Sequence, residues 1–282
     1  MLKYNEIENK IEIIGKEEFN PKHILECGQF FRYKKIDEKT YELVSGNHLI
    51  TIIENDNGYT LLTNDCTFAK DLFNFNVDYA VIKNKIENID GVKDKVHFAN
   101  GLRILHNGEF ETICSFIISQ NNNIKRIKLI IERLCERAGA KIDETHYAFP
   151  LVEEMQKLDE QFFVSIGAGY RAKYLANLVD NYKSFLKCDP SSLSTDDLRR
   201  ELLKILGVGR KVADCILLFA YNRTDVFPVD VWMERVYKEV FGGKKTERTK
   251  MSEDLVERFG ELSGYIQQYM FYYKTVEEKE SR

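Results

Sequence analysis

The chain has 282 residues, of which 44% are hydrophobic, and its formal net charge is −4 at pH 7. This size and composition predict a globular protein of two or three compact units. There is no run of about 18 apolar residues that could span a membrane, and the first residues lack the apolar core of a signal peptide, so we expect a cytoplasmic protein without membrane contact. The negative charge argues mildly against nucleic-acid binding, although residues 204–250 hold ten Lys and Arg against six Asp and Glu.

The cysteines and histidines do not have the spacing of a metal site. The chain contains Cys27, Cys66, Cys114, Cys135, Cys188 and Cys215. They form no CxxC pair, and several lie in apolar runs with helical spacing. We therefore expect reduced thiols in the core. Because neither a zinc site nor an iron–sulfur loop fits this pattern, the sequence predicts no metal and no cofactor.

Residues 28–64 have the composition of short β-strands. Runs rich in aromatic and β-branched residues occur at 29–33, 41–44, 49–53 and 59–62. The segments between them contain the Ser, Gly, Asn and Asp residues of tight turns. We expect these runs to form a small antiparallel sheet.

After about residue 67 the spacing of apolar residues becomes helical. The candidate helices are 110–119, 124–138, 151–158, 161–166, 171–186, 195–206, 211–221, 231–241 and 253–273. The predicted fold class is therefore α+β, with an N-terminal antiparallel β unit followed by a mostly α-helical body. We expect an N-terminal sheet domain with flanking helices at 1–100, and a helical domain at 101–282 with a helix-hairpin-helix motif near 196–221.

The hairpin connects its two helices through Gly207, Val208 and Gly209. Two glycines allow a tight turn and leave the first amides of the second helix bare, which makes an anion site. Lys211 stands beside this site, and Asp230 follows 19 positions later. A phosphate-holding turn, an amine and a carboxylate suggest chemistry on the sugar of a nucleic-acid backbone. From spacing alone, Lys211 could equally be a surface residue that contacts a phosphate, and Asp230 a helix N-cap.

Two further segments are polar and lie between helices. Residues 120–126, Gln-Asn-Asn-Asn-Ile-Lys-Arg, open a helix after an apolar run, and residues 167–172, Gly-Ala-Gly-Tyr-Arg-Ala, present an aromatic residue and a cation. Asparagines in series are usually turn and cap residues, and a glycine-rich stretch is usually a helix C-cap. An enzyme that flips a base needs groups of this kind to fill the vacated space in the duplex.

Together these segments resemble the helix-hairpin-helix base-excision DNA glycosylases, and within them the 8-oxoguanine DNA glycosylase/AP lyases. The likeness extends from Gly28 to Phe271. It rests on Gly-Val-Gly-x-Lys, Pro-Val-Asp, Asn-Asn-Asn-Ile-x-Arg and the Gly-Gln-x-Phe-Arg that begins at Gly28. The resemblance implies that Lys211 attacks the sugar C1′ and that Asp230 stabilises the positive charge developing on the ring.

The resemblance also implies how the duplex is opened. Asn121 would fill the gap left by the flipped base, and Tyr170 would act as a wedge beside the estranged cytosine. Arg126 and Arg171 would contact that cytosine, whose unpaired edge offers two acceptors to a guanidinium.

The lesion pocket implied by the family is assembled from distant segments. The carbonyl of Gly28 would accept the N7 hydrogen that 8-oxoguanine has and guanine lacks, and Cys215 and Phe271 would sandwich the base. Gln267 would bind its Watson–Crick edge, with Gln268 as a competing candidate. Where animal relatives commonly carry a phosphate-binding histidine, this chain has Trp232.

We therefore predict a bifunctional glycosylase/AP lyase, a monomer acting on double-stranded DNA that contains 8-oxoguanine opposite cytosine. One alternative is a helix-hairpin-helix glycosylase for another lesion, such as an alkylated purine. The other is a hairpin module that binds DNA without catalysis.

Overall fold

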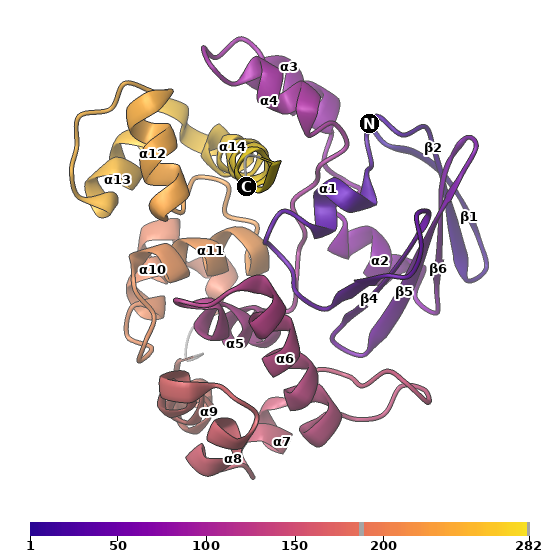
Figure 1. The fold of residues 1–282 in the computed structure, drawn as a ribbon, viewed down its shortest axis with the longest axis vertical. Helices are drawn as coiled ribbons and strands as arrows, with labels where there is room; N and C mark the ends of the chain where they lie inside the picture. The colour runs from indigo at the N-terminus through magenta and orange to yellow at the C-terminus, as the bar shows by residue number, and fades with distance from the viewer. Residues whose placement is uncertain (186–188, 281–282) are drawn as a thin grey trace.

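A computed structural model of the protein describes residues 1–185 and 189–280 (Figure 1). In these residues the N-terminal part is a six-stranded antiparallel sheet in the order β1-β2-β6-β5-β4-β3. The strands are β1 (Lys3–Ile7), β2 (Lys10–Ile14), β3 (Tyr33–Lys35), β4 (Thr40–Ser45), β5 (His48–Asn55) and β6 (Gly58–Thr63). The rest of the molecule is helical, which confirms the predicted α+β fold class.

Tight turns set the register of the central strands. The β4–β5 hairpin closes with Ser45 opposite His48, and the β5–β6 hairpin with Asn55 opposite Gly58. Gly58 has φ +155°, and a Cβ on it would lie 2.1 Å from the carbonyl oxygen of Ile13 on the neighbouring strand. These are the two turns that the sequence predicts, and they direct alternate residues such as Ile50 and Ile52 into the core beneath the sheet.

Two parts of the sheet differ from the prediction. The run 29–33 is not a strand until Tyr33, because Gln29 is buried and its side chain bonds the carbonyls of Ile24 and Arg103 and the amide of Leu105. The hairpin of β1 and β2 was not predicted. All five residues of β1 are exposed, since it is the outermost strand, so the alternation that identifies a strand is missing.

Figure 1 shows the sheet at one side of the molecule and most of the helices at the other. Its helices are α1 (Pro21–Leu25), α2 (Cys66–Leu72), α3 (Tyr79–Ile86), α4 (Lys93–Phe98), α5 (Glu109–Ser119), α6 (Ile124–Ala138), α7 (Val152–Met155), α8 (Glu160–Ser165), α9 (Ala172–Phe185), α10 (Thr195–Leu202), α11 (Arg210–Ala220), α12 (Val231–Glu239), α13 (Arg248–Phe259) and α14 (Ser263–Glu280). Helix α2 covers the sheet, whereas α4 packs against α14. The boundary at residue 100 stays a prediction.

The predicted hairpin is present as α10 and α11, and it packs on α5. The side chain of Ser194 caps α10 by accepting the amide of Asp197. Apolar residues of α11 from Val212 to Ala220 are buried, and Phe219 stacks on Phe116 of α5 with ring centroids 5.5 Å apart. This packing fixes the N-terminus of α11 at the edge of the core.

The single helix predicted at 253–273 is wrong. The chain forms α13 and α14 instead, which are separated by a short 3₁₀ turn at Gly260–Leu262. Gly260 has φ +54°, a left-handed conformation that ends α13. The break lets α14 turn toward the hairpin.

None of the helices in the described ranges is long and apolar enough to cross a membrane. Cys27, Cys66, Cys114, Cys135 and Cys215 are buried and free, as expected, and Cys188 lies outside the described residues.

Candidate active site

The turn between α10 and α11 is shaped by its glycines. Gly207 has φ +87°, and a Cβ there would lie 2.5 Å from the ring of Tyr174. Gly209 is the N-cap of α11 and has no side chain to occupy the first amides of the helix, while Val208 is buried and anchors the turn. The bare amides and the helix dipole together provide the predicted anion site.

Lys211 lies in the first turn of α11, partly exposed, with its Nζ 5.3 Å from the ring centroid of Phe116. Burial acts to lower the pKa of Lys211, but the Cys215 sulfur and the Asp230 carboxylate outweigh it, so the pKa is raised above its ordinary value. Burial also raises the pKa of Cys215, to about 11, against the opposing effect of Lys211.

Asp230 is the N-cap of α12. One carboxylate oxygen accepts the amides of Trp232 and Met233, both at 2.9 Å. The capping role that spacing alone favours is therefore present. Capping leaves the other carboxylate oxygen available, and Asp230 lies on the same cavity as Lys211.

The four residues predicted for the lesion pocket share one small cavity with Lys211 and Asp230. It has a volume of about 30 Å³ and is lined by Cys27, Gly28, Phe116, Lys211, Cys215, Phe219, Pro228, Asp230, Gln267, Gln268 and Phe271. A space of this size holds about one water, so the side chains must separate to admit a purine. Gly28 has φ +78°, and a Cβ on it would lie 3.1 Å from the Phe271 ring.

Both glutamines of α14 line this cavity. Gln267 and Gln268 are buried, and the Oε1 of each has no hydrogen-bond partner. Buried unpaired polar atoms are costly, and in a functional pocket they are typical of groups that a ligand satisfies. The structure brings both candidates to the pocket, and the choice of Gln267 as the residue that binds the base edge stays a prediction.

The segments 120–126 and 167–172 meet beside the hairpin. Asn121 has φ +46°, and its amide donates to the Tyr170 hydroxyl at 3.3 Å. Tyr170 is 52% exposed, so its ring projects from the surface as a wedge would. The guanidinium of Arg126 is exposed and donates to the Gly167 carbonyl at 3.3 Å.

Arg171 differs from Arg126 because it is buried. Its side chain donates to the carbonyls of Gln120, Asn121 and Ala168. In the DNA-free protein it therefore ties the two segments together, and the predicted contact with cytosine would have to use its remaining donor capacity.

A larger groove of about 580 Å³ runs from the asparagine segment to the start of α13. Gly209, Lys211 and Asp230 line its floor, and Trp232 lies at its side, half-buried, with the Arg235 guanidinium 4.9 Å from its ring. Trp232 thus lines the groove and also packs against the neighbouring hydrophobic core. Sequence reasoning missed Arg248, Thr249 and Ser252, which also line this groove.

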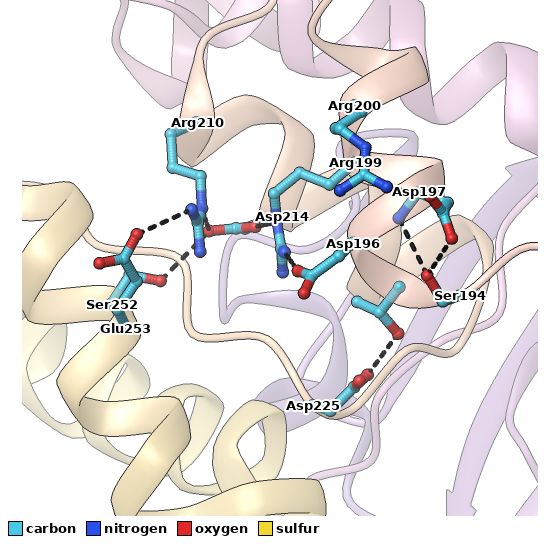
Figure 2. A network of polar contacts seen from close by, with 11 residues as sticks. Ser194, Asp196, Asp197, Arg199, Arg200, Arg210, Asp214, Asp225, Ser252 and Glu253 are labelled. Carbon is cyan, nitrogen blue, oxygen red and sulfur yellow. Dashed lines mark hydrogen bonds and ion pairs between the residues drawn. The ribbon is translucent and has the colours of Figure 1, made fainter.

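A buried carboxylate behind the nucleophile was also missed. Figure 2 shows Asp214 of α11 between two arginines, Arg199 of α10 at 2.7 Å and Arg210 at 3.0 Å, with the Ser252 hydroxyl of α13 at 3.3 Å. Asp214 is fully buried. A charged residue in the apolar run of a hairpin helix was the available sequence signal, since such a residue is almost never buried unless it is paired.

The described part of the chain contains no cluster of three His, Cys, Asp or Glu residues that could hold a metal ion.

Comparisons with known proteins agree with this geometry. Residues 12–113 match the 8-oxoguanine DNA glycosylase N-terminal domain, and residues 114–261 match the HhH-GPD superfamily of base excision DNA repair proteins. A probable N-glycosylase/DNA lyase of Methanothermobacter thermautotrophicus is 32% identical over 61% of this chain and 63% of its own length. The N-glycosylase/DNA lyase of Saccharomyces cerevisiae is 29% identical over 80% of this chain and 69% of its own.

Solved structures resemble the chain over its whole length. The 8-oxoguanine glycosylase/lyase of Clostridium acetobutylicum, in complex with double-stranded DNA containing cytosine opposite 8-oxoguanine, has a TM-score of 0.91 at 32% identity and covers 99% of this chain and 98% of its own. The chain therefore belongs to the HhH-GPD superfamily of base excision DNA repair proteins and carries the N-terminal domain of the 8-oxoguanine DNA glycosylases.

Proposed function

We propose that the protein is a bifunctional DNA glycosylase/AP lyase that excises 8-oxoguanine opposite cytosine from duplex DNA during base excision repair. The observation that carries this proposal is the shared cavity, on which Lys211 and Asp230 lie with Gly28, Cys215, Gln267 and Phe271. A nucleophile and a carboxylate thus meet the groups that would hold the base. The N-glycosylase/DNA lyase relatives and the Clostridium enzyme support the same activity.

The chemistry uses the lysine twice. The Lys211 nitrogen forms a bond to C1′ as the bond from C1′ to the base breaks, and the base leaves with the electron pair and takes up a proton. Opening of the sugar ring gives a protonated Schiff base on Lys211. Loss of a proton from C2′ then expels the 3′ phosphate by β-elimination, and the Asp230 carboxylate stabilises the positive charge that develops on the sugar.

The raised pKa of Lys211 adds a step to this mechanism. The amine must lose its proton before it attacks, because only the neutral form is a nucleophile. We therefore place the proton loss after DNA has entered the groove. Phosphates in the groove do not favour that loss, which leaves the departing base and Asp230 as the acceptors within reach.

The opposite strand would be held by two segments that meet beside the hairpin, through Asn121, Arg126, Tyr170 and Arg171. We expect the enzyme to act as a cytoplasmic monomer, without cofactor, since each group that the proposed reaction needs comes from one chain.

Reductive trapping tests the proposal. The full-length protein is incubated with borohydride and a duplex that carries 8-oxoguanine opposite cytosine, and matched duplexes carry guanine or 3-methyladenine instead. We expect a covalent adduct and rapid single-turnover excision only with 8-oxoguanine. Faster excision of the alkylated base would make the protein a glycosylase for another lesion, and binding without any adduct would reduce it to a DNA-binding module.

A further inference from the structure

A second cavity lies away from the active site, between the sheet and helix α6. Its volume is about 310 Å³, within the range of about 300–1,000 Å³ that holds small organic ligands. Strands β3 and β4 form one wall, α6 forms the opposite wall, and residues 146–147 close the end. No residue that lines it also lines the active-site cavity or the groove.

A buried guanidinium lines this cavity without its full set of partners. Arg32 is only 6% exposed, and its Nε and Nη1 have no hydrogen-bond acceptor. Its Nη2 donates to the Tyr147 carbonyl, and its Nη1 forms an ion pair with the buried Glu111 carboxylate at 3.8 Å. Arg32 is thus neutralised by Glu111, and its two unbonded nitrogens are enclosed in the protein, so its guanidinium is part of the cavity wall and not a free cation.

Lys128 of α6 is the second cation on the cavity. Its Nζ lies 3.1 Å from the ring centroid of Tyr33 and donates to the Tyr33 carbonyl at 2.9 Å, and none of the described carboxylates forms an ion pair with it. Burial lowers the pKa of Lys128 to about 8. The ammonium form of Lys128 would bind a nearby anion more strongly than the neutral amine does, and the bound anion would raise the pKa of Lys128 again.

The other charged residues of the cavity are already paired. Lys34 lies 3.3 Å from Glu132, and His146 lies 3.7 Å from Glu42. The rest of the lining is apolar or aromatic, and includes Leu43, Leu129 and Tyr147. The cavity therefore offers unsatisfied positive charge at one place and apolar walls elsewhere.

We propose that this cavity is a binding site for a small aromatic anion, with a carboxylate or sulfonate group held by Lys128. The aromatic body of the ligand packs between the apolar residues of β4 and Leu129 of α6. The site is separate from the DNA groove, so the ligand and DNA bind at the same time.

The probe for this site is 8-anilino-1-naphthalenesulfonate, whose fluorescence rises on binding, and its uncharged counterpart N-phenyl-1-naphthylamine is the control. We expect saturable binding of the sulfonate with one site per chain. Lys128→Met should weaken binding of the sulfonate by about tenfold or more, which is the effect of losing one charged hydrogen bond. Binding of the neutral dye should not change. Lys125→Met, on the same helix but outside the cavity, should change neither.

A second pair of variants guards against misfolding of Lys128→Met. Leu129 is 48% exposed, so both Leu129→Glu and Leu129→Gln should fold. The glutamate should repel the sulfonate, whereas the glutamine should not. The proposal would be overturned if the two Leu129 variants had equal effects on binding of the sulfonate, or if Lys128→Met weakened binding of both dyes equally. Displacement of the sulfonate by saturating duplex DNA would also overturn it.

Discussion

At the scale of single residues, Lys211 carries the clearest expectation. Lys211→Gln should abolish base excision and the borohydride-trapped adduct, since no other amine lines the small cavity within the part of the chain that the structure describes. Binding of lesion DNA should remain largely intact, because the amides after Gly209 hold the phosphate. Single-turnover excision and binding anisotropy measure the two effects, and normal excision by the variant would disprove the assignment.

Gly28 is expected to recognise the lesion and not to act in strand cleavage. A Cβ would lie 3.1 Å from the Phe271 ring, and φ +78° would strain any side chain there. Gly28→Ala should therefore lower 8-oxoguanine excision by well over tenfold, about 1.4 kcal/mol or more. Cleavage of a preformed abasic site needs Lys211 but no base pocket, and should fall much less. If both activities fell equally in a folded variant, Gly28 would be a structural residue only.

The two arginines near the estranged base should behave differently. Both Arg126→Ala and Arg171→Ala should weaken the preference for cytosine opposite the lesion, each by about 1–3 kcal/mol. Arg171→Ala should also lower the melting temperature, because it removes the side-chain hydrogen bonds that join the carbonyls of Gln120, Asn121 and Ala168. Arg126 is exposed, and its loss should leave stability unchanged. Excision opposite all four bases, with a melting curve for each variant, tests this; a uniform loss would assign the arginines to phosphates.

At the scale of elements, the Asp214 network joins α10, α11 and α13 behind the nucleophile (Figure 2). Asp214→Asn should destabilise the protein by about 3 kcal/mol, because it removes the only buried carboxylate that Arg199 and Arg210 share among the described residues and leaves them with the more exposed Asp196 and Glu253. Denaturant unfolding measures the change. Asp197→Asn is the matched control, since it breaks an exposed ion pair with Arg200 on the same hairpin and should have little effect.

The elements show what sequence patterns can and cannot predict. Helix α6 begins and ends at the predicted residues, because Asn123 caps it and Gly139 follows it. Local signals of this kind identify a helix without any knowledge of the elements that pack against it. The break at Gly260 was missed because apolar spacing continues through it, and β1 because its surroundings in the sheet, not its pattern, make it a strand.

The residues of the site can also be divided into those that the sequence predicts and those that it does not. The hairpin glycines, Lys211 and Asp230 could be proposed from spacing and helix-end chemistry. The pocket residues could be predicted only through the family resemblance, because Gly28, Cys215 and Phe271 come from three separated segments. Asp214, Arg248 and Phe116 were missed, since their roles depend on long-range packing that neither a motif nor a period encodes.

At the scale of the whole molecule, a net charge of −4 must be reconciled with binding to DNA. Several cations at the groove are already engaged by carboxylates, Arg210 by Asp214 and Arg248 by Glu234. The turn after α10 offers amides, which neutralise no phosphate and release few counterions. The protein should therefore grip DNA mainly through backbone groups and a small number of side chains.

This arrangement predicts a shallow salt dependence. Binding of the non-cleaving Lys211→Gln variant to a lesion duplex should weaken by less than about 100-fold between 50 and 200 mM salt, below the 10³–10⁵ expected of a protein with about 6–10 phosphate contacts. If the Arg248 guanidinium reaches a phosphate from the groove, Arg248→Ala should reduce the slope of the logarithm of the binding constant against the logarithm of the salt concentration by about one. Glu234→Gln should act in the opposite direction, because it frees Arg248 from its ion pair. Fluorescence anisotropy over a salt series measures DNA binding by all three proteins. A salt dependence as steep as that of a protein with about 6–10 phosphate contacts would show that surface cations, and not the hairpin amides, provide most of the binding to DNA.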